Sequence, residues 1–474
     1  MYSASSQVRG FIITDTIFAL SSAPGRAGVA VIRVSGPKAR TVGDLMAGVA
    51  GRPLEERRVR YTAIRHPISG ALLDRGLAVW FPTPMSFTGE DVLEFQVHGG
   101  LAVVQAFLDA LEEISDCRMA EPGEFTRRAF AAGKLDLAEV EGLADLIDAQ
   151  TEAQRVQALS QAGGGLSRIY EDWRARLIKA RAVIEAVIDF SDEEDVAISP
   201  LEDVTGAVAA LNGDILKHLH DGNRGEIVRD GFKIVIAGAP NVGKSSLLNG
   251  LARRDAAIVS SQAGTTRDVV EVRLDLGGYA VVVSDTAGIR EASGEIEVEG
   301  IRRSIERVKD ADLVLWMIDL SDPSGPPPVE VLERLGPVMV VLNKSDLVER
   351  VDEDRIRKGW PPGARKWLQS LGETISVCAV SPGGIGELTT RLTQIVCKRI
   401  GETGSPVLSR ARHRAQLSAC QADLNAFLKG THGGEIELQA ELLRTACDAL
   451  GRITGRVDVE DVLDEVFGQF CIGK

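Results

Sequence analysis

Apolar positions along the first quarter of the chain follow the two-residue period of strands. Alternating or continuous apolar runs over residues 29–34, 77–81 and 92–97 predict strands. Residues 101–114 instead have the spacing of an amphipathic helix. We therefore predict an α/β domain over residues 1–132.

A helical period then takes over. Apolar residues recur every three or four positions from about residue 135 to 228, interrupted by three glycines at 163–165 that predict a turn between helices. Helical spacing returns over 406–474. Neither half is expected to close a core alone, which favours one helical domain formed by 133–229 and 401–474. Two separate helical domains are the alternative.

The segment between these halves, residues 230–400, has the pattern of an α/β nucleotide-binding domain. An apolar strand over 232–237 leads into Gly-Ala-Pro-Asn-Val-Gly-Lys-Ser-Ser at 238–246, and the residues that follow continue at helical spacing. Strand, glycine-rich loop and helix are the context of a P-loop. Backbone amides at the helix N-terminus hold phosphates. Lys244 would neutralise the β- and γ-phosphates, and Ser245 would hold Mg²⁺.

Three more GTPase segments follow in order. Gly-Thr-Thr-Arg-Asp at 264–268 offers a threonine hydroxyl to Mg²⁺, and Asp-Thr-Ala-Gly at 285–288 ends a predicted strand. Asn-Lys-Ser-Asp at 343–346 follows another strand, and Asp346 would accept two hydrogen bonds from guanine. A chance match is the alternative for one motif, but four in order argue against it. From these motifs the predicted GTP-binding residues are Asn241, Val242, Gly243, Lys244, Ser245, Ser246, Asp285, Thr286, Ala287, Gly288, Asn343, Lys344 and Asp346. We expect a Ras-like P-loop domain, with a mixed sheet flanked by helices, inserted in the helical domain.

The hydrolytic machinery departs from that of Ras. Ile289 stands where Ras-type enzymes have the glutamine that orients water, and no arginine is obviously presented in cis. Another group must therefore orient the water. Asn241 offers a side-chain oxygen near the phosphates, where a monovalent cation could supply the missing positive charge.

Composition and charge bound the remaining possibilities. The 474 residues suffice for about three domains, and the six cysteines form no C-x-x-C pair, so neither a zinc site nor a disulfide framework is indicated. A net charge of −14 makes the chain a weak nucleic-acid binder without a basic patch or partner. No apolar run reaches the roughly 18 residues of a membrane span, and no signal peptide is recognisable. We expect a cytoplasmic protein.

Further segments carry a resemblance to a known family. They are Asp-Thr-Ile-Phe-Ala at 15–19, Pro-Gly-Arg-Ala-Gly-Val at 24–29, Phe-Thr-Gly-Glu-Asp-Val-Leu-Glu at 87–94, His-Gly-Gly at 98–100, Glu-Pro-Gly-Glu-Phe-Thr at 121–126, Gly-Lys-Leu-Asp-Leu at 133–137, Gly-Arg-Ile-Thr-Gly at 451–455 and Phe-Cys-Ile-Gly-Lys at 470–474. With these, the chain resembles from end to end the MnmE (TrmE) family, tRNA-modification GTPases of bacteria and organelles.

The resemblance implies a one-carbon site in the N-terminal domain. That domain resembles folate-binding domains, and it would dimerise and hold 5-formyltetrahydrofolate or 5,10-methylenetetrahydrofolate. The positions aligned with folate contacts are Arg33, Glu94, Lys134 and Lys474. Taken singly and without the resemblance, each is better interpreted as an ordinary surface ion-pair residue.

The resemblance also implies GTPase domains that dimerise across the nucleotide when K⁺ is bound. The implied K⁺ ligands are Asn241, Thr265 and, through their backbone carbonyls, Ser260 and Gln262; the implied Mg²⁺ ligands are Ser245 and Thr266. Glu297 matches the family's glutamate that orients the attacking water. It would thus do the work of the glutamine that Ile289 replaces. Lys244, Glu297 and Cys471 are thus the predicted catalytic residues.

A flavin-dependent partner, MnmG (GidA), completes what the resemblance implies. Together the homodimer and this partner would add an aminomethyl or carboxymethylaminomethyl group to carbon five of the tRNA wobble uridine. Cys471 matches the cysteine of the family's tail. Its thiol could be a nucleophile or act near the folate, or the tail could only dock; both interpretations stay open.

One segment departs from the GTPase pattern. The last guanine-contact motif, usually Ser-Ala-Lys, reads Cys-Ala-Val at 378–380. Ala379 keeps the backbone amide that can meet the guanine oxygen, whereas Val380 removes a packing and polar contact, so modestly weaker nucleotide binding is expected. Two alternatives to the tRNA-modifying GTPase remain: a ribosome-assembly GTPase acting as a binding switch, and a dimerising scaffold that remodels a partner.

Overall fold

The computed structural model describes most of the chain in two compact units. The described residues are 15–48, 52–189, 199–253, 258, 271–285, 310–323, 337–348, 374–381, 383–401, 406–430, 436–457, 460–468, 470, 472 and 473. The first unit comprises Met1–Ala144, Gln161–Asn212 and Gln416–Lys474. The second comprises Asp145–Ser160 and Gly213–Ala415.

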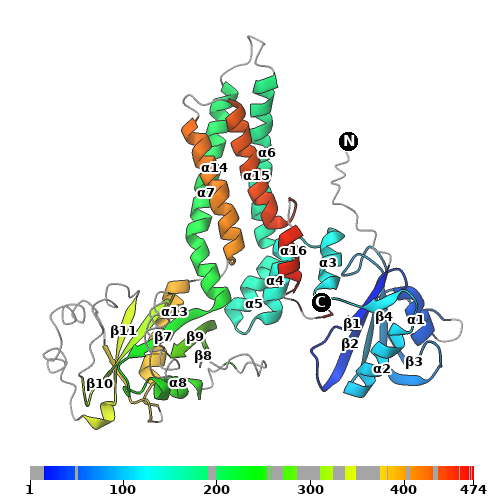
Figure 1. Ribbon diagram of the computed structural model, residues 1–474, viewed down its shortest axis with the longest axis horizontal. Coiled ribbons are helices and arrows are strands. Elements are labelled where there is room, and N and C mark those ends of the chain that lie inside the picture. The colour runs from blue at the N-terminus through cyan, green and yellow to red at the C-terminus, as the bar shows by residue number, and fades with distance from the viewer. Residues whose placement is uncertain are drawn as a thin grey trace, which may run out of the picture. The chain divides into compact units, whose positions relative to one another are not determined.

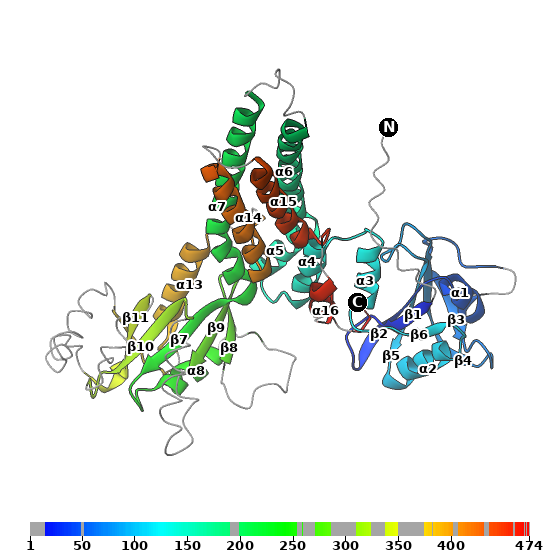
Figure 2. The same cartoon turned by 45° about the horizontal axis from the view of Figure 1, so that its top comes forward.

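A six-stranded sheet of order β3-β4-β5-β2-β1-β6 forms the N-terminal part of the first unit (Figure 2). Its strands are β1 (Thr16–Leu20), β2 (Ala27–Ser35), β3 (Arg60–Arg65), β4 (Leu72–Phe81), β5 (Val92–Gly99) and β6 (Cys117–Met119). Neighbouring strands are antiparallel, except that β1 and β6 run parallel. The short edge strand β6 is followed by α3 (Glu124–Ala131).

Alternation along the strands gives this sheet two different faces. One face packs on α1 (Ala39–Ala47) and α2 (Leu101–Glu112) and holds the larger core, with Ile32 and Phe95 fully buried. The opposite face carries a smaller apolar cluster of Ile17, Ala19, Phe87, Ala120 and Phe125. Phe125 comes from α3, and Phe87 comes from the loop between β4 and β5.

Helices make up the rest of the first unit. They are α4 (Leu137–Asp148), most of which belongs here, α6 (Gly165–Asp189), α15 (Ile436–Thr454) and α16 (Glu460–Gly468), with part of α7 (Ser199–Asp230) and of α14 (Ala411–Gly430). Helix α6 packs along α15 (Figure 1), so segments on both sides of the GTPase motifs in sequence lie side by side. The Asn212 side chain on α7 donates a 2.8 Å hydrogen bond to Asn425 on α14.

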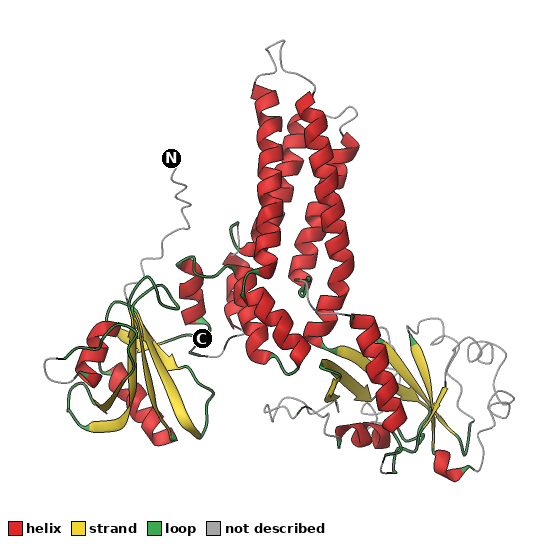
Figure 3. Ribbon diagram, turned by 180° about the vertical axis from the view of Figure 1, so that it is seen from behind, coloured by secondary structure: helices red, strands yellow, loops and turns green. Residues whose placement is uncertain are grey.

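The second unit is built on a sheet of order β12-β11-β10-β7-β9-β8 (Figure 3). Its elements are α5 (Glu152–Ala162), β7 (Phe232–Gly238), α8 (Lys244–Ala252), β8 (Glu271–Leu276), β9 (Tyr279–Asp285), β10 (Leu313–Asp319), β11 (Val338–Asn343), the 3₁₀ turn η2 (Ser345–Leu347), β12 (Thr374–Ser376) and α13 (Gly386–Ile400). Only β8 is antiparallel to its neighbour. Every residue of the central strand β10 is buried, as expected for a parallel strand covered on both faces.

The strand and helix periodicities identified in the N-terminal part of the sequence are confirmed by the structure. Strands occur at all three predicted positions of the N-terminal domain, and α2 covers most of the predicted helix. The turn predicted at the three glycines separates α5 from α6. Strands β1, β3 and β6 and helices α1 and α3 were not predicted. In the described part of the chain, no helix combines the length and apolarity needed to cross a membrane.

Candidate functional site

The P-loop turns sharply from β7 into α8. Asn241 and Gly243 both adopt left-handed backbone angles, with φ of 62° and 99°. A Cβ atom on Gly243 would lie 2.3 Å from the Asn343 side-chain nitrogen, so glycine is required by space as well as by conformation. The end of β7 is similarly tight, because a Cβ on Gly238 would lie 2.5 Å from the Met317 carbonyl oxygen.

Lys244 and Ser245 open α8 and lie where the motif predicts. The buried Lys244 ammonium donates to the carbonyl oxygens of Gly238 at 3.0 Å and Ala239 at 2.9 Å. Ser245 Oγ donates to Asp285 Oδ2 at 2.9 Å, so the P-loop and the end of β9 meet. An octahedral Mg²⁺ places neighbouring ligand oxygens about 3 Å apart. The hydroxyl therefore fits a Mg²⁺ ligand, with the carboxylate in reach through a ligand water.

Asn343, at the end of β11, connects the phosphate and base sides. Its side-chain amide donates to the Val242 carbonyl at 2.7 Å, and its oxygen accepts from the Ala379 backbone N–H at 3.1 Å. The amide predicted to meet guanine is thus held by Asn343. Asp346 lies in η2, on the adjoining turn.

Asp319 was not predicted, yet it forms part of this site. It ends β10 and pairs with the Lys344 ammonium. Burial alone would raise the pKa of Asp319, but hydrogen bonds from Lys344 and Ser321 bring it below its usual value. Lys344 and Asp319 help to line a cavity of about 210 Å³ that also reaches Pro240 and Asn241. The cavity joins the P-loop to the guanine motif.

In the first unit, two predicted folate residues contact each other. Arg33 on β2 and Glu94 on β5 are register partners, and Arg33 Nε lies 2.9 Å from Glu94 Oε1. Each side chain is 19 % exposed. The Arg33 guanidinium carbon also lies 5.2 Å from the Phe87 ring centroid and 5.7 Å from that of Phe125. The pair therefore sits on the sheet face opposite α1 and α2.

Lys134, the third described folate candidate, is exposed just beyond α3. A Cβ on Gly89 would lie 3.5 Å from Lys134 Cε, so the lysine stem runs along the loop that carries Phe87. The lysine is therefore near the same loop as the ring that contacts Arg33.

The C-terminal tail docks on the same domain. Gly473 accepts a 2.7 Å hydrogen bond from the Ser21 hydroxyl, and Ile472 forms an antiparallel bridge with Pro122. Gly473 has a φ of 104°, and a Cβ there would lie 2.1 Å from the Leu20 carbonyl oxygen. Leu20 follows Ala19, the register partner of Arg33, so the tail reaches the strand next to the Arg33–Glu94 pair.

Several predicted site residues lie outside the described residues. They are Ser260, Gln262, Thr265, Thr266, Thr286, Ala287, Gly288, Glu297, Cys471 and Lys474. Their roles stay predictions.

Comparison with known proteins decides the family. Residues 16–134 match the family model of the GTP-binding protein TrmE N-terminus, and residues 137–471 match that of the MnmE helical domain. A tRNA modification GTPase MnmE of Parvibaculum lavamentivorans is 51 % identical over 97 % of this chain and 100 % of the relative. The chain belongs to the MnmE family.

Other relatives cover the chain as fully. An MnmE of Rhizobium johnstonii is 46 % identical over 98 % of this chain and all of its own length. A Danio rerio protein named 5-taurinomethyluridine-[tRNA] synthase subunit GTPB3, mitochondrial, is 47 % identical over 97 % of this chain and 93 % of its own. The predicted family is thus confirmed, and these relatives favour tRNA modification over the ribosome-assembly alternative.

As an MnmE family member, the chain brings together two kinds of chemistry. The second unit offers oxygens and an ammonium suited to a magnesium-bound nucleotide, whereas the first offers an arginine–carboxylate pair flanked by aromatic rings. In the described part of the chain, no group of three or more His, Cys, Asp and Glu side chains is placed to hold a metal without a ligand's help.

Proposed function

We propose that this protein is a potassium-dependent, dimerisation-activated GTPase that works with a flavin-dependent partner of the MnmG type. Together they add an aminomethyl or carboxymethylaminomethyl group to carbon five of the tRNA wobble uridine in the cytoplasm. The observation that carries the proposal is the geometry of the P-loop: Lys244 bonds to its backbone, Ser245 meets Asp285, and Asn343 ties the loop to the guanine motif. The names of full-length relatives supply the link to tRNA modification.

The P-loop residues would bind the phosphates by exchanging partners. Lys244 exchanges its contacts with two backbone carbonyls for contacts with the β- and γ-phosphate oxygens. Ser245 and Thr266 hold Mg²⁺, and Asp285 reaches it through water. Bound Mg²⁺ neutralises the charge that develops on the phosphates. Asp346 then selects guanine, because it accepts two hydrogen bonds for which adenine has no matching donors.

Fast hydrolysis of GTP would require two GTPase domains to dimerise. Asn241, Thr265 and the backbone carbonyls of Ser260 and Gln262 surround K⁺, which supplies the positive charge given elsewhere by an arginine finger. Glu297 orients the attacking water in place of the glutamine that Ile289 replaces. The homodimer would also be held by the N-terminal domains.

The N-terminal domain would hold the one-carbon donor, 5-formyl- or 5,10-methylenetetrahydrofolate. Glu94 can accept hydrogen bonds from pterin donors, and Lys134 and Lys474 can pair with glutamate carboxylates of the folate. Arg33, predicted to pair with those carboxylates, is instead bonded to Glu94 and would orient the Glu94 carboxylate at the pterin. The contact of Gly473 with the strand beside Arg33 supports a tail that places Cys471 and Lys474 at this site. We further propose that the GTPase domain is inserted in one helical domain, in line with the packing of α6 on α15.

Nucleoside mass spectrometry tests the function. A host lacking this protein is rescued with the wild type, Cys471→Ser or the matched Cys397→Ser, whose cysteine lies on α13. We expect the wild type and Cys397→Ser to restore the modified wobble uridine and Cys471→Ser to fail. If Cys471→Ser also restores the modified uridine, the thiol is not required and the tail only docks on the N-terminal domain. Failure of the expressed wild type would overturn the tRNA-modification role.

A further inference from the structure

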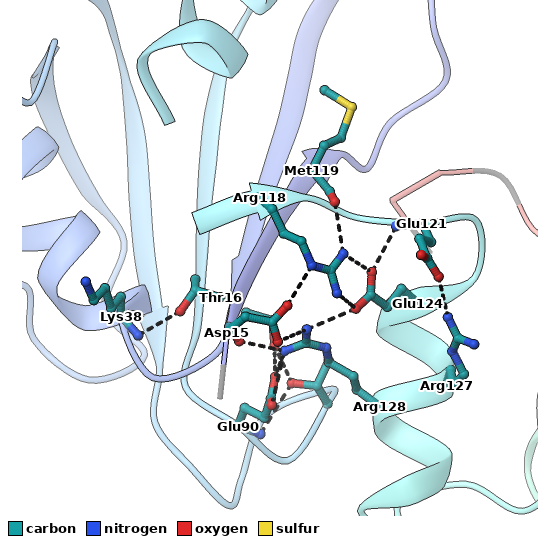
Figure 4. A network of polar contacts seen from close by, with 12 residues as sticks. Asp15, Thr16, Lys38, Glu90, Arg118, Met119, Glu121, Glu124, Arg127 and Arg128 are labelled. Atoms are coloured by element: carbon teal, nitrogen blue, oxygen red, sulfur yellow. Dashed lines mark hydrogen bonds and ion pairs between the residues drawn. The ribbon is translucent and has the colours of Figure 1, made fainter. Parts of the chain in front are cut away.

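Five charged side chains form a connected network between β1, β6, α3 and the loop after β4 (Figure 4). Arg128, only 4 % exposed, donates to Asp15 Oδ1 at 3.0 Å, to Glu124 Oε1 at 3.0 Å and to Glu90 Oε2 at 3.2 Å. Arg118 donates to Asp15 Oδ2 at 2.6 Å and to the two Glu124 oxygens at 2.8 and 2.6 Å. Arg128 thus ties together segments that are far apart in sequence.

Glu124 is held in its charged form by this network. Burial alone would raise the pKa of Glu124, but hydrogen bonds from Arg118, from the Glu121 backbone N–H and from Arg128 bring it to about 2. A buried arginine is tolerated only when its donors are paired, and a planar guanidinium with several fixed partners sets their relative positions. A lysine in its place offers a single point charge and cannot hold all three carboxylates in the same geometry.

Two carboxylates of this network adjoin the rings that contact Arg33. Glu90 belongs to the loop of Phe87, and its Oε2 also accepts a 2.7 Å hydrogen bond from Ser35 on β2. Glu124 directly precedes Phe125 on α3. Arg128 therefore anchors both segments from which Phe87 and Phe125 reach the Arg33 guanidinium.

This arrangement assigns Arg128 a role at the one-carbon site, and the assignment rests on the folate binding proposed above. We propose that Arg128 is a positioning residue that never touches the folate. It holds the Phe87 and Phe125 rings in place, and the rings keep the Arg33 guanidinium against Glu94 in the orientation that binds the ligand.

The test measures binding of 5-formyltetrahydrofolate to the full-length protein by calorimetry. Arg128→Lys keeps the charge and should weaken binding about tenfold, since groups coupled through shared partners typically interact at this level. Arg127→Lys is the matched control: Arg127 is the neighbouring residue, 38 % exposed, and pairs with Glu121 outside the network. It should bind like the wild type. GTP affinity of each preparation, which depends on the other unit, should be unchanged.

A double-mutant cycle separates positioning from plain stability. If Arg128 acts through Arg33, then Arg128→Lys should weaken binding less than about twofold in an Arg33→Gln background. Full additivity of the two substitutions would overturn the proposal, because Arg128 would then act independently of Arg33. Wild-type affinity of a folded Arg128→Lys would overturn it as well.

Two remaining outcomes are also decisive. If Arg128→Lys does not fold, Glu90→Gln replaces it in the same cycle, because it weakens the Arg128 contact while keeping the side-chain shape, and the same non-additivity is required. If the wild type binds GTP but does not bind 5-formyltetrahydrofolate, the proposed one-carbon function is wrong. The proposed role of Arg128 is then wrong as well.

Discussion

The two candidate sites of this protein hold their charged groups in opposite ways. At the P-loop, the Lys244 ammonium is satisfied by backbone carbonyls, and the Ser245 hydroxyl by Asp285. Phosphate oxygens can take the place of the carbonyls around Lys244, and Mg²⁺ can bind the Ser245 hydroxyl. At the N-terminal sheet, Arg33 is paired with Glu94, another candidate ligand-binding residue, and the buried Arg128 holds the segments that carry the neighbouring rings.

The difference separates an exchangeable site from a pre-organised one. A GTPase switch needs partners that change with the nucleotide state. The N-terminal site instead draws its geometry from side chains paired with each other, Arg33 with Glu94 and the buried Arg128 with three carboxylates, which keep a ligand's contacts in fixed positions. Substitutions should therefore damage the two sites in different ways.

The largest effect is expected at the exchangeable site. Lys244→Ala removes the ammonium aimed at the phosphates and should lower the GTP turnover number about 10²–10³-fold, as loss of one preorganised charge-stabilising group does. Steady-state phosphate release in K⁺ buffer measures it. Folate affinity should not change, because the Arg33–Glu94 pair belongs to the other unit.

Lys233→Ala is the control for this prediction. Lys233 is an exposed lysine on β7, the strand that leads into the P-loop. Turnover should stay at the wild-type level. An equal loss in both variants would show that the effect comes from the strand and not from the phosphate contact.

An effect of intermediate size is expected when the pH is lowered, because α7 should lose stability at a higher pH than α3. Burial lowers the pKa of His218 on α7 to about 4 from an ordinary 6.5, with nearby Asp221 opposing and His413 adding to the shift. The stabilisation from a neutral His218 is thus complete above pH 6.5 and is lost as the pH falls towards 4. Glu124, with a pKa near 2 against an ordinary 4.5, keeps its stabilisation down to pH 4.5.

Hydrogen exchange between pH 7 and 4 measures this separation. For the part of α7 in the second unit, we expect the free energy of opening to fall by about 2–3 kcal/mol over this range. The free energy of opening of α3 should not change. His218→Gln should remove most of the loss, and His220→Gln, an exposed histidine on the same helix, should not. Simultaneous loss of protection in α3 and α7 would contradict the separation.

The contrast also explains what could be predicted from the sequence. The P-loop follows from local spacing, because strand, turn and helix are consecutive and its glycines are required by φ and by space. Asp319 was missed, since its partner Lys344 is 25 residues away and meets it only because β10 and β11 are neighbours.

The N-terminal site depends even more on contacts distant in sequence. Arg33 and Glu94 were predicted as separate ligand contacts, but their pairing depends on β5 lying beside β2, a strand order that periodicity does not encode. Arg128, on the unpredicted helix α3, was not singled out from the sequence at all. Its partner Asp15 is 113 residues away, and only the folded sheet brings the two together.

The smallest effect is expected where the sequence departs from the usual guanine motif. Val380 is 77 % exposed, and the Ala379 N–H just before it is held by Asn343. Val380→Lys would add a long stem beside the base, but an exposed contact of this kind contributes at most about 1 kcal/mol. GTP affinity should therefore rise only about two- to threefold, with Val380→Ala at the wild-type level. Because Asp346 is the residue proposed to select guanine, the preference for GTP over ATP should stay the same in all three proteins. A changed preference for GTP over ATP would mean that residues 378–380 also help to select the base. The nucleotide site would then depend on fixed side-chain contacts, as the N-terminal site does.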